Sequence, residues 1–142
     1  MAWVNPSPTE LAADWIASRV EGADEATSGH LAQFLIVDFP DEEPELTWEA
    51  IQLVIQAFPE ADLYALSEND AQRVCGLLAA GPVEDLLSYH GPSFIKRFED
   101  AAREDPRMAW VLGGVWQCGM TDEIWNRVKR VADNSYWTRP NN

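Results

Sequence analysis

The sequence predicts an all-α protein of seven or eight antiparallel helices. Apolar residues recur three and four positions apart in each periodic segment, which is the repeat of an amphipathic helix. No segment alternates apolar and polar residues as a half-buried strand does. Residues that cap or break helices separate these segments. We therefore expect either a short HEAT-like stack of helical hairpins or a compact orthogonal bundle.

Two helices are expected near the N-terminus. The first begins at Ser7-Pro8-Thr9-Glu10, where Ser can cap, Pro takes the first helical position and Glu the third. Gly22 is a natural stop for this helix. A second helix should run from about Gly29 to Asp38, and we expect it to be central because its apolar residues leave little polar face. These residues are Leu31, Phe34, Leu35, Ile36 and Val37.

The third and fourth helices follow the acidic stretch 38–45. The third, Pro44 to about Phe58, has the clearest helical period, with Trp48, Ile51, Ile55 and Phe58 opposite Glu45, Glu49, Gln52 and Gln56. In the fourth, Ser67 followed by Asp70 predicts the start, and the helix should reach Ala79 or Ala80. Gly81-Pro82 then separates it from a short fifth helix that ends near His90-Gly91.

Three further helices complete the predicted fold. The sixth places Phe94, Ile95, Phe98, Ala101 and Ala102 inward, and the seventh follows Asp105-Pro106 with Trp110, Val111, Val115 and Trp116. Thr121-Asp122-Glu123 opens the eighth, with Ile124, Trp125, Val128, Val131 and Ala132 as its apolar stripe. Trp3 and the tail 136–140 lie outside clear helices, and we expect them to dock onto the fold. The predicted core includes Phe34, Leu35, Ile51, Ile55, Phe58, Phe94, Phe98, Val115, Trp125 and Val128.

Length and composition predict one helical domain over residues 1–142, with a short lead at 1–6 and a tail at 134–142. A chain of 142 residues with 46% apolar residues is large enough to bury a core. No apolar run approaches the roughly 20 residues of a membrane span, and no secretory signal is evident. We expect a soluble, cytoplasmic protein in which Cys75 and Cys118 are free thiols.

The charge is concentrated in the first half of the chain. Residues 1–70 contain 15 acidic residues and a single base, Arg19, whereas residues 71–142 contain nine of each sign, so the first half carries the whole formal charge of −14. This balance argues against direct nucleic-acid binding, which needs clustered Lys and Arg. The densest acidic stretch, 38–45, has two prolines and should be a solvated connection between helices.

Two helix starts are similar in sequence. Residues 43–48 and 105–110 both read acid, Pro, any residue, apolar, small, Trp, at an offset of 62 positions. If this is an internal repeat, the unit is about two helical hairpins long, which favours the stack of helix pairs.

Three segments together resemble a family of small, all-helical bacterial domains of unknown function. They are the acid-Pro start that leads to Trp48, the segment Leu77–Leu87, and Leu112-Gly113-Gly114-Val115-Trp116 followed by Gly119–Trp125. The resemblance covers roughly residues 9–132. It implies a bacterial or phage origin and transfers no catalytic residue.

Catalytic and metal chemistry find little support in the residue pattern. His30, His90, Cys75 and Cys118 have no spacing typical of a zinc site, and the glycine-bounded turns of nucleophilic enzymes are missing. His90 is better explained as a cap at a helix C-terminus. Gly113-Gly114 lacks the preceding strand and the Lys of a phosphate loop, so close helix packing or a helix break explains it better. We therefore expect no catalytic residue, metal or cofactor.

The acidic first half is the candidate functional feature. We expect a non-enzymatic module that docks onto a basic, nucleic-acid-handling partner protein, as an inhibitor or an immunity protein does, with its acids standing in for part of a phosphate track. The alternative is a helical adaptor or scaffold subunit of a bacterial or phage complex, held by apolar anchors; an enzyme is the third possibility. The sequence leaves the oligomeric state open. The predicted partner-binding residues are Asp41, Glu42, Glu43, Glu45 and Glu49.

Overall fold

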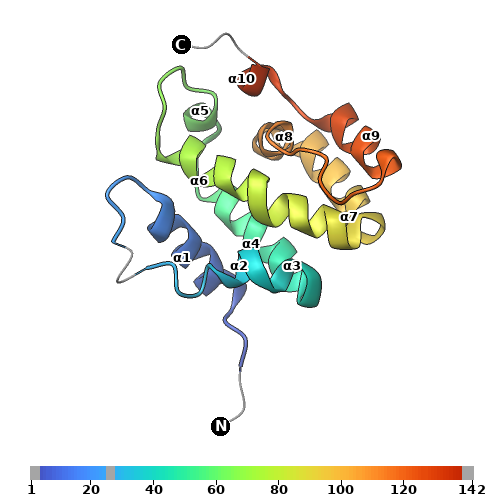
Figure 1. The fold of residues 1–142 in the computed structure, drawn as a ribbon. Coiled ribbons are helices and arrows are strands. Elements are labelled where there is room, and N and C mark those ends of the chain that lie inside the picture. Colours follow the sequence, from blue (N-terminus) through green and yellow to red (C-terminus); the bar gives the residue numbers. More distant parts are fainter. Residues whose placement is uncertain (1–3, 25–27, 139–142) are drawn as a thin grey trace.

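A computed structural model describes residues 4–24 and 28–138, and these residues form helices and no strand (Figure 1). The all-α class is therefore confirmed. Besides the longer predicted helices, the described residues contain four short ones, each of four residues. No described helix has the length and apolar character that a membrane crossing requires.

Helix α1 (Pro8–Arg19) begins as predicted. Ser7 Oγ accepts a hydrogen bond from the Glu10 backbone N–H at 3.1 Å, and Glu10 Oε1 accepts one from the Ser7 N–H at 3.0 Å, which is a complete capping box. Leu11 and Trp15 on its inner face are fully buried, and α1 packs chiefly against α4 (Pro44–Gln56). The Trp15 indole N–H donates to the Val74 carbonyl on α6 (Asp70–Leu78), which ties the two helices together.

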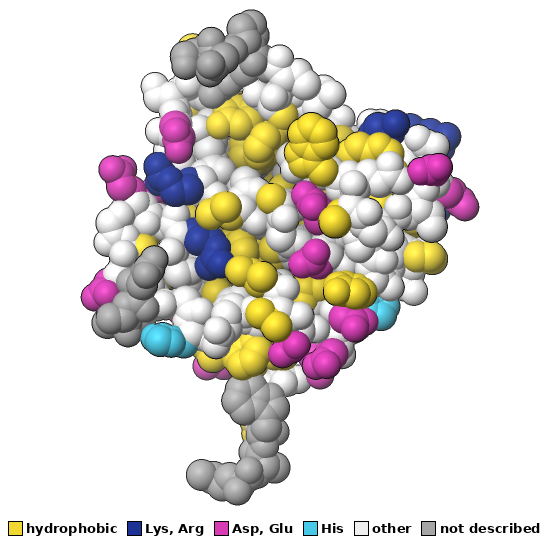
Figure 2. Space-filling view, viewed as in Figure 1, with side chains coloured by type: hydrophobic (Ala, Val, Ile, Leu, Met, Phe, Trp, Pro, Cys, Tyr) yellow, Lys and Arg dark blue, Asp and Glu magenta, His cyan; other side chains and the backbone are white. Residues whose placement is uncertain are grey.

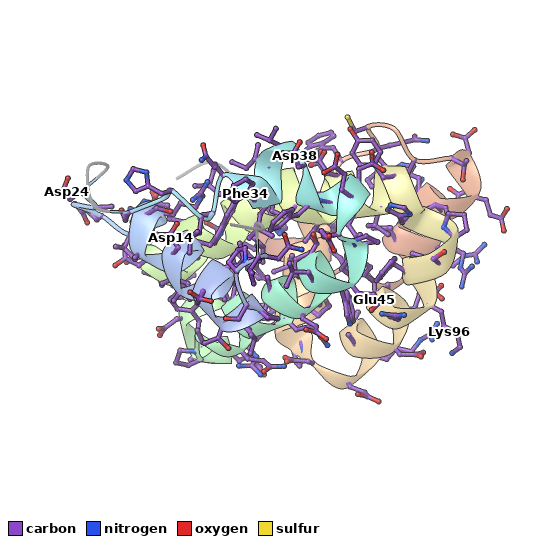
Figure 3. All side chains as sticks on the ribbon, turned by 90° about the horizontal axis from the view of Figure 1, so that it is seen from below. Asp14, Asp24, Phe34, Asp38, Glu45 and Lys96 are labelled. Carbon is purple, nitrogen blue, oxygen red and sulfur yellow. The ribbon has the colours of Figure 1, made fainter. Side chains whose placement is uncertain are left out.

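The prediction of the second helix is wrong in two respects: the helix is shorter than expected, and it is not central in the fold. Only α2 (Phe34–Val37) forms, because the Asp14 carboxylate accepts the backbone N–H groups of Gly29, Leu31 and Ala32 at 2.8–2.9 Å. These bonds hold the start of the segment in turns against α1, beside Asp14 in Figure 3. Helix α2 lies at the surface, with Ile36 48% and Val37 68% exposed, so it is not central.

The acidic stretch is more ordered than a solvated connection. Residues Phe39–Glu42 form the short helix α3, which turns Phe39 and Pro40 into the interior. The Phe39 ring stacks on that of Phe34, with 5.0 Å between centroids. Helix α4 then starts at Pro44 and buries Trp48, Ile51 and Ile55, as its period predicts.

The middle of the chain forms one nearly continuous helical rod. After the short α5 (Glu60–Leu63), helix α6 is capped by Asn69, whose side chain accepts from the Gln72 N–H, and not by the predicted Ser67. The predicted break at Gly81-Pro82 is a π-helical turn, η1 (Ala79–Val83), that leads directly into α7 (Glu84–Glu104). A wider turn accommodates a proline that cannot donate a helical hydrogen bond. The predicted end at His90 is a kink within α7, where φ is −133° and ψ is 31°.

The C-terminal helices surround α7. Helices α8 (Pro106–Gly113) and α9 (Asp122–Val131) begin at side-chain caps from Asp105 and Thr121, as predicted. Glu99 of α7, only 8% exposed, pairs with Arg127 of α9. The short α10 (Ser135–Thr138) docks its Trp137 against α8, where the indole N–H donates to the Trp110 carbonyl at 2.8 Å. Docking is thus confirmed for Tyr136 and Trp137, while Trp3, Arg139 and Pro140 lie outside the described residues.

The predicted core is confirmed in most positions. Buried as expected are Leu35, Ile51, Ile55, Phe94, Phe98, Val115 and Val128. Phe34, Phe58 and Trp125 are only partly buried at the margin of the core. Trp116, predicted on the seventh helix's apolar stripe, is 75% exposed. Helix α8 ends at Gly113, so the helical spacing that would have turned this indole inward no longer applies.

Candidate partner-binding surface

The five predicted partner-binding acids lie on α3, on α4 and at the junction between them. Asp41, Glu42, Glu45 and Glu49 are exposed, and Glu43 is partly buried. Their interactions with the rest of the fold differ, so they do not offer five equivalent charges to a partner.

Glu45 is used within the fold. Its two carboxylate oxygens accept hydrogen bonds from the Arg97 guanidinium of α7 at 2.6 and 2.7 Å. Figure 3 places Glu45 between α4 and the C-terminal part of α7. The hydrogen bonds from Arg97 lower the pKa of Glu45, and Arg97 also lies 4.5 Å above the centroid of the Phe94 ring. A partner would have to break this ion pair to reach the Glu45 carboxylate.

Asp41 lies beside His90, at the kink in α7. The His90 Nε2 atom is 2.7 Å from the Asp41 backbone oxygen and 3.6 Å from its carboxylate. Because a carbonyl oxygen only accepts, this contact requires a proton on Nε2. The predicted capping role of His90 is thus directed at a carbonyl of α3 and not at its own helix.

Glu42, Glu43 and Glu49 form no ion pair with any residue that the structure describes. Glu49 lies further along α4, in a shallow groove beside Pro8 and Thr9 at the start of α1. Asp41, Glu42 and Glu43 therefore remain the densest group of acids, and Glu45 and Glu49 contribute separately.

A second surface, which the sequence did not predict, runs along the helical rod. Four residues follow one another at intervals of four positions along α6, the π turn and the first half of α7: Leu77, Gly81, Asp85 and Tyr89. Leu77 is 48% and Tyr89 58% exposed. Figure 2 shows this side of the molecule, where apolar side chains form a band that acidic side chains interrupt.

Apolar side chains from other segments also lie beside this second surface. Helix α2, which packs against η1, presents Ile36 and Val37 on one side. On the other side, the segment after α8 presents Trp116 and is held to α7 by two hydrogen bonds. The Trp116 backbone N–H donates to Glu84 Oε2 at 3.2 Å, and the Gly119 N–H donates to Ser88 Oγ at 3.1 Å. We refer to Ile36, Val37, Leu77, Glu84, Asp85, Tyr89 and Trp116 together as the apolar–acidic face.

Glu84 and Asp85 are the only two charged residues of the apolar–acidic face. Burial raises the pKa of both carboxyl groups, and for Glu84 the hydrogen bond from the Trp116 N–H offsets part of this effect. Neither carboxylate has an ion pair with a Lys, Arg or His among the described residues. The face thus holds two partly desolvated negative charges without a compensating cation.

Neither cysteine belongs to a metal-binding cluster among the described residues. Within the described ranges, no three His, Cys, Asp or Glu side chains group together as ligands for a metal ion. Both cysteines are free; Cys75 is buried, which raises the pKa of its thiol to about 12, and Cys118 is exposed.

Sequence reasoning missed the apolar–acidic face because its members come from four separate segments. One local signal was present: a Gly-Pro pair inside a helical period, followed directly by two acids. Single π-helical turns inside α-helices are frequent at functional sites.

Comparison with known proteins identifies the family to which the chain is similar. A model described as a family of unknown function, DUF6869, matches residues 20–136. No curated protein and no solved structure matches the chain.

Proposed function

The chain belongs to this family of unknown function, and we propose that it is a non-enzymatic, acidic protein-binding module. Its partner is a basic protein that handles nucleic acid, and the module acts on it as an inhibitor or immunity protein of a bacterial or phage system. The observation that carries the proposal is the pair of partly buried carboxylates, Glu84 and Asp85, on the apolar–acidic face without a cation.

Uncompensated charges in a partly apolar setting are costly to the isolated protein. Desolvation disfavours the ionised carboxylate, and an approaching Lys or Arg restores a favourable environment for it. The Trp116 backbone N–H bonds to Glu84, the Trp116 residue is 75% exposed, and Trp is enriched among interface hot spots. The face therefore suits a partner surface that combines basic and apolar side chains.

The acids of α3 have a supporting role in this proposal. Helix α3 packs against α7. The Asp41 backbone oxygen lies 2.7 Å from Nε2 of His90, the residue that follows Tyr89 of the apolar–acidic face. Asp41, Glu42 and Glu43 thus extend the negative field from one end of the face. Charges at the rim of an interface mainly raise the association rate. Glu49 adds to the field from α4, while Glu45 remains with Arg97.

A helical adaptor is the second candidate, and the exposure of Trp116, Val37 and Leu77 favours it. In an adaptor these apolar groups would supply the affinity, and the net charge would serve only solubility. Salt separates the two functions, because electrostatic docking weakens as salt rises and an apolar contact does not.

The proposal is tested by capture of the native partner at low salt, followed by affinity measurements with the purified partner. The test variant is E84Q/D85N, which removes two charges and keeps the side-chain shapes. The matched control is E60Q/D62N, which removes two exposed charges from α5. We expect a basic partner, at least tenfold weaker binding for the test variant and nearly unchanged binding for the control. Equal affinities for both variants, or an acidic partner, would contradict the proposal.

A further inference from the structure

A pocket of about 370 Å³ lies between the end of α8, α9 and α10. Its walls contain three indoles, from Trp116, Trp125 and Trp137. The remaining lining side chains are mostly aliphatic: Leu112, Val115, Val128 and Ala132. Size and composition match those of small-molecule sites, which are mostly apolar with a few placed polar groups.

The position of Trp137 depends on two glycines. A Cβ atom on Gly113 would lie 2.7 Å, and one on Gly114 2.5 Å, from the Trp137 ring. Any larger residue at either position would displace this ring. The Trp137 indole N–H is also held by the Trp110 carbonyl at 2.8 Å, and its ring packs against that of Trp110 with 4.7 Å between centroids. One wall of the pocket is thus held in place by packing and a hydrogen bond.

Among the described residues, Lys129 is the only charged one in the pocket lining. Its ammonium group lies 5.6 Å from the centroid of the Trp125 ring, within the range of a cation–π contact. It forms no ion pair with an acidic side chain in the described part of the chain. In a protein with a formal charge of −14, this pocket therefore has a local positive group, and none of its described wall residues carries a carboxylate.

We propose that this pocket binds a small aromatic carboxylate. The planar ring would lie among the indoles of Trp116, Trp125 and Trp137, and the carboxylate would meet Lys129 at the rim. The Asn134 and Thr138 side chains, also in the lining, offer neutral polar groups beside it. This site shares Trp116 with the apolar–acidic face but includes neither Glu84 nor Asp85, and the proposal does not depend on the protein-binding function.

The proposal is tested with 1-naphthylacetate as the probe, its neutral amide and the cationic 1-naphthylmethylamine as comparisons, and calorimetry of the full chain. We expect the acid to bind best, and the indole N–H signals of Trp116, Trp125 and Trp137 to shift in NMR spectra. Lys129→Met keeps the aliphatic stem and removes the charge, so it should weaken acid binding by about tenfold or more and leave amide binding unchanged. Arg130→Met is the matched control, because this neighbouring cation does not line the pocket.

Several outcomes would overturn the assignment. They are no binding of the acid at millimolar concentration, equal binding of acid and amide, or equal losses for Lys129→Met and Arg130→Met. Tighter binding of the amine would assign the indole walls to a cation instead. Circular dichroism confirms that each variant is folded. The E84Q/D85N variant should bind 1-naphthylacetate normally, so failure of this proposal is distinguishable from failure of the protein-binding function.

Discussion

Glu84, the first residue of α7, accepts a hydrogen bond from the backbone N–H of Trp116 at 3.2 Å, which joins the start of α7 to the connection after α8. This bond holds the most exposed tryptophan of the described residues next to a partly desolvated carboxylate. The arrangement adds little to the core. Its consequence is a surface on which an apolar anchor and an uncompensated charge are adjacent.

The two face carboxylates should destabilise the isolated protein at neutral pH. Their folded-state pKa values are raised above the ordinary 4.5 for Glu84 and 3.8 for Asp85. The protonated carboxyl groups therefore contribute to the stability of the folded protein when the pH is below those ordinary values. This contribution to stability is lost as the pH rises through the raised folded-state pKa values. We expect Asp85→Asn to increase the free energy of unfolding at pH 7 by a few tenths of a kcal/mol, since the site is partly exposed. Urea denaturation at pH 7 and near pH 3 checks this, and a gain that persists at the lower pH would contradict the ionic explanation.

Phe98 and Trp125 should differ in their contribution to stability. Phe98 is fully buried and its ring meets Trp48 edge to face, with 4.7 Å between centroids. Phe98→Ala should cost about 3–5 kcal/mol of unfolding free energy. Trp125 is only partly buried at the pocket, so Trp125→Ala should cost clearly less. Denaturant titration measures the unfolding free energy of both variants. An equal loss of unfolding free energy would mean that Trp125 belongs to the core.

Substitution of Gly114 by Ala should destabilise the protein, whereas the same substitution at Gly81 should not. A Cβ atom on Gly114 would lie 2.5 Å from the Trp137 ring, whereas one on Gly81 would find its nearest neighbour at 3.9 Å, on Trp15. Gly114→Ala should therefore cost about 1–3 kcal/mol through displaced packing. Gly81→Ala should be near neutral or slightly stabilising. The two variants are compared by thermal denaturation, and a neutral Gly114→Ala would contradict the close docking of Trp137.

The Glu99–Arg127 pair should be the most important ion pair for stability. The carboxylate is 8% exposed, and the hydrogen bonds from Arg127 lower its pKa below the ordinary 4.5. Because the folded-state pKa is lowered, the ionised Glu99 carboxylate contributes to stability at pH values above its ordinary pKa. This contribution is lost as the pH falls through the folded-state pKa. Arg127→Met would leave Glu99 buried without a partner, so its urea midpoint at pH 7 should fall well below that of Arg130→Met on the same helix. Equal midpoints for the two variants would show that the pair is dispensable.

The sequence predicted the features that depend on neighbours within one helical turn. The Ser7 capping box, the Thr121 cap and the apolar face of α4 are all of this kind. The failures involve partners far along the chain. Asp14 withdraws the backbone N–H groups of Gly29 and Ala32 from a helix, and Arg97 neutralises a predicted docking acid 52 positions away. The partial burial of Asp85 likewise depends on how separate helices pack, which no local pattern encodes.

The acids at the end of α3 and at its junction with α4 should act on the association rate alone. E42K/E43K reverses two charges that form no ion pair among the described residues, so helicity should be retained. We expect slower association with the purified partner at low salt and convergence with wild type at high salt, because rim charges steer the encounter. Stopped-flow mixing measures this. An increased dissociation rate would instead place these acids inside the contact.

Dissociation kinetics of the partner complex test the central claim about Glu84, Asp85 and Trp116 most directly. Residues in the centre of an interface govern the dissociation rate, whereas distant charges do not. For the E84Q/D85N and Trp116→Ala variants we predict dissociation at least tenfold faster than wild type at high salt, with E60Q/D62N indistinguishable from wild type. If both face variants dissociate at the wild-type rate, the apolar–acidic face is not the binding surface.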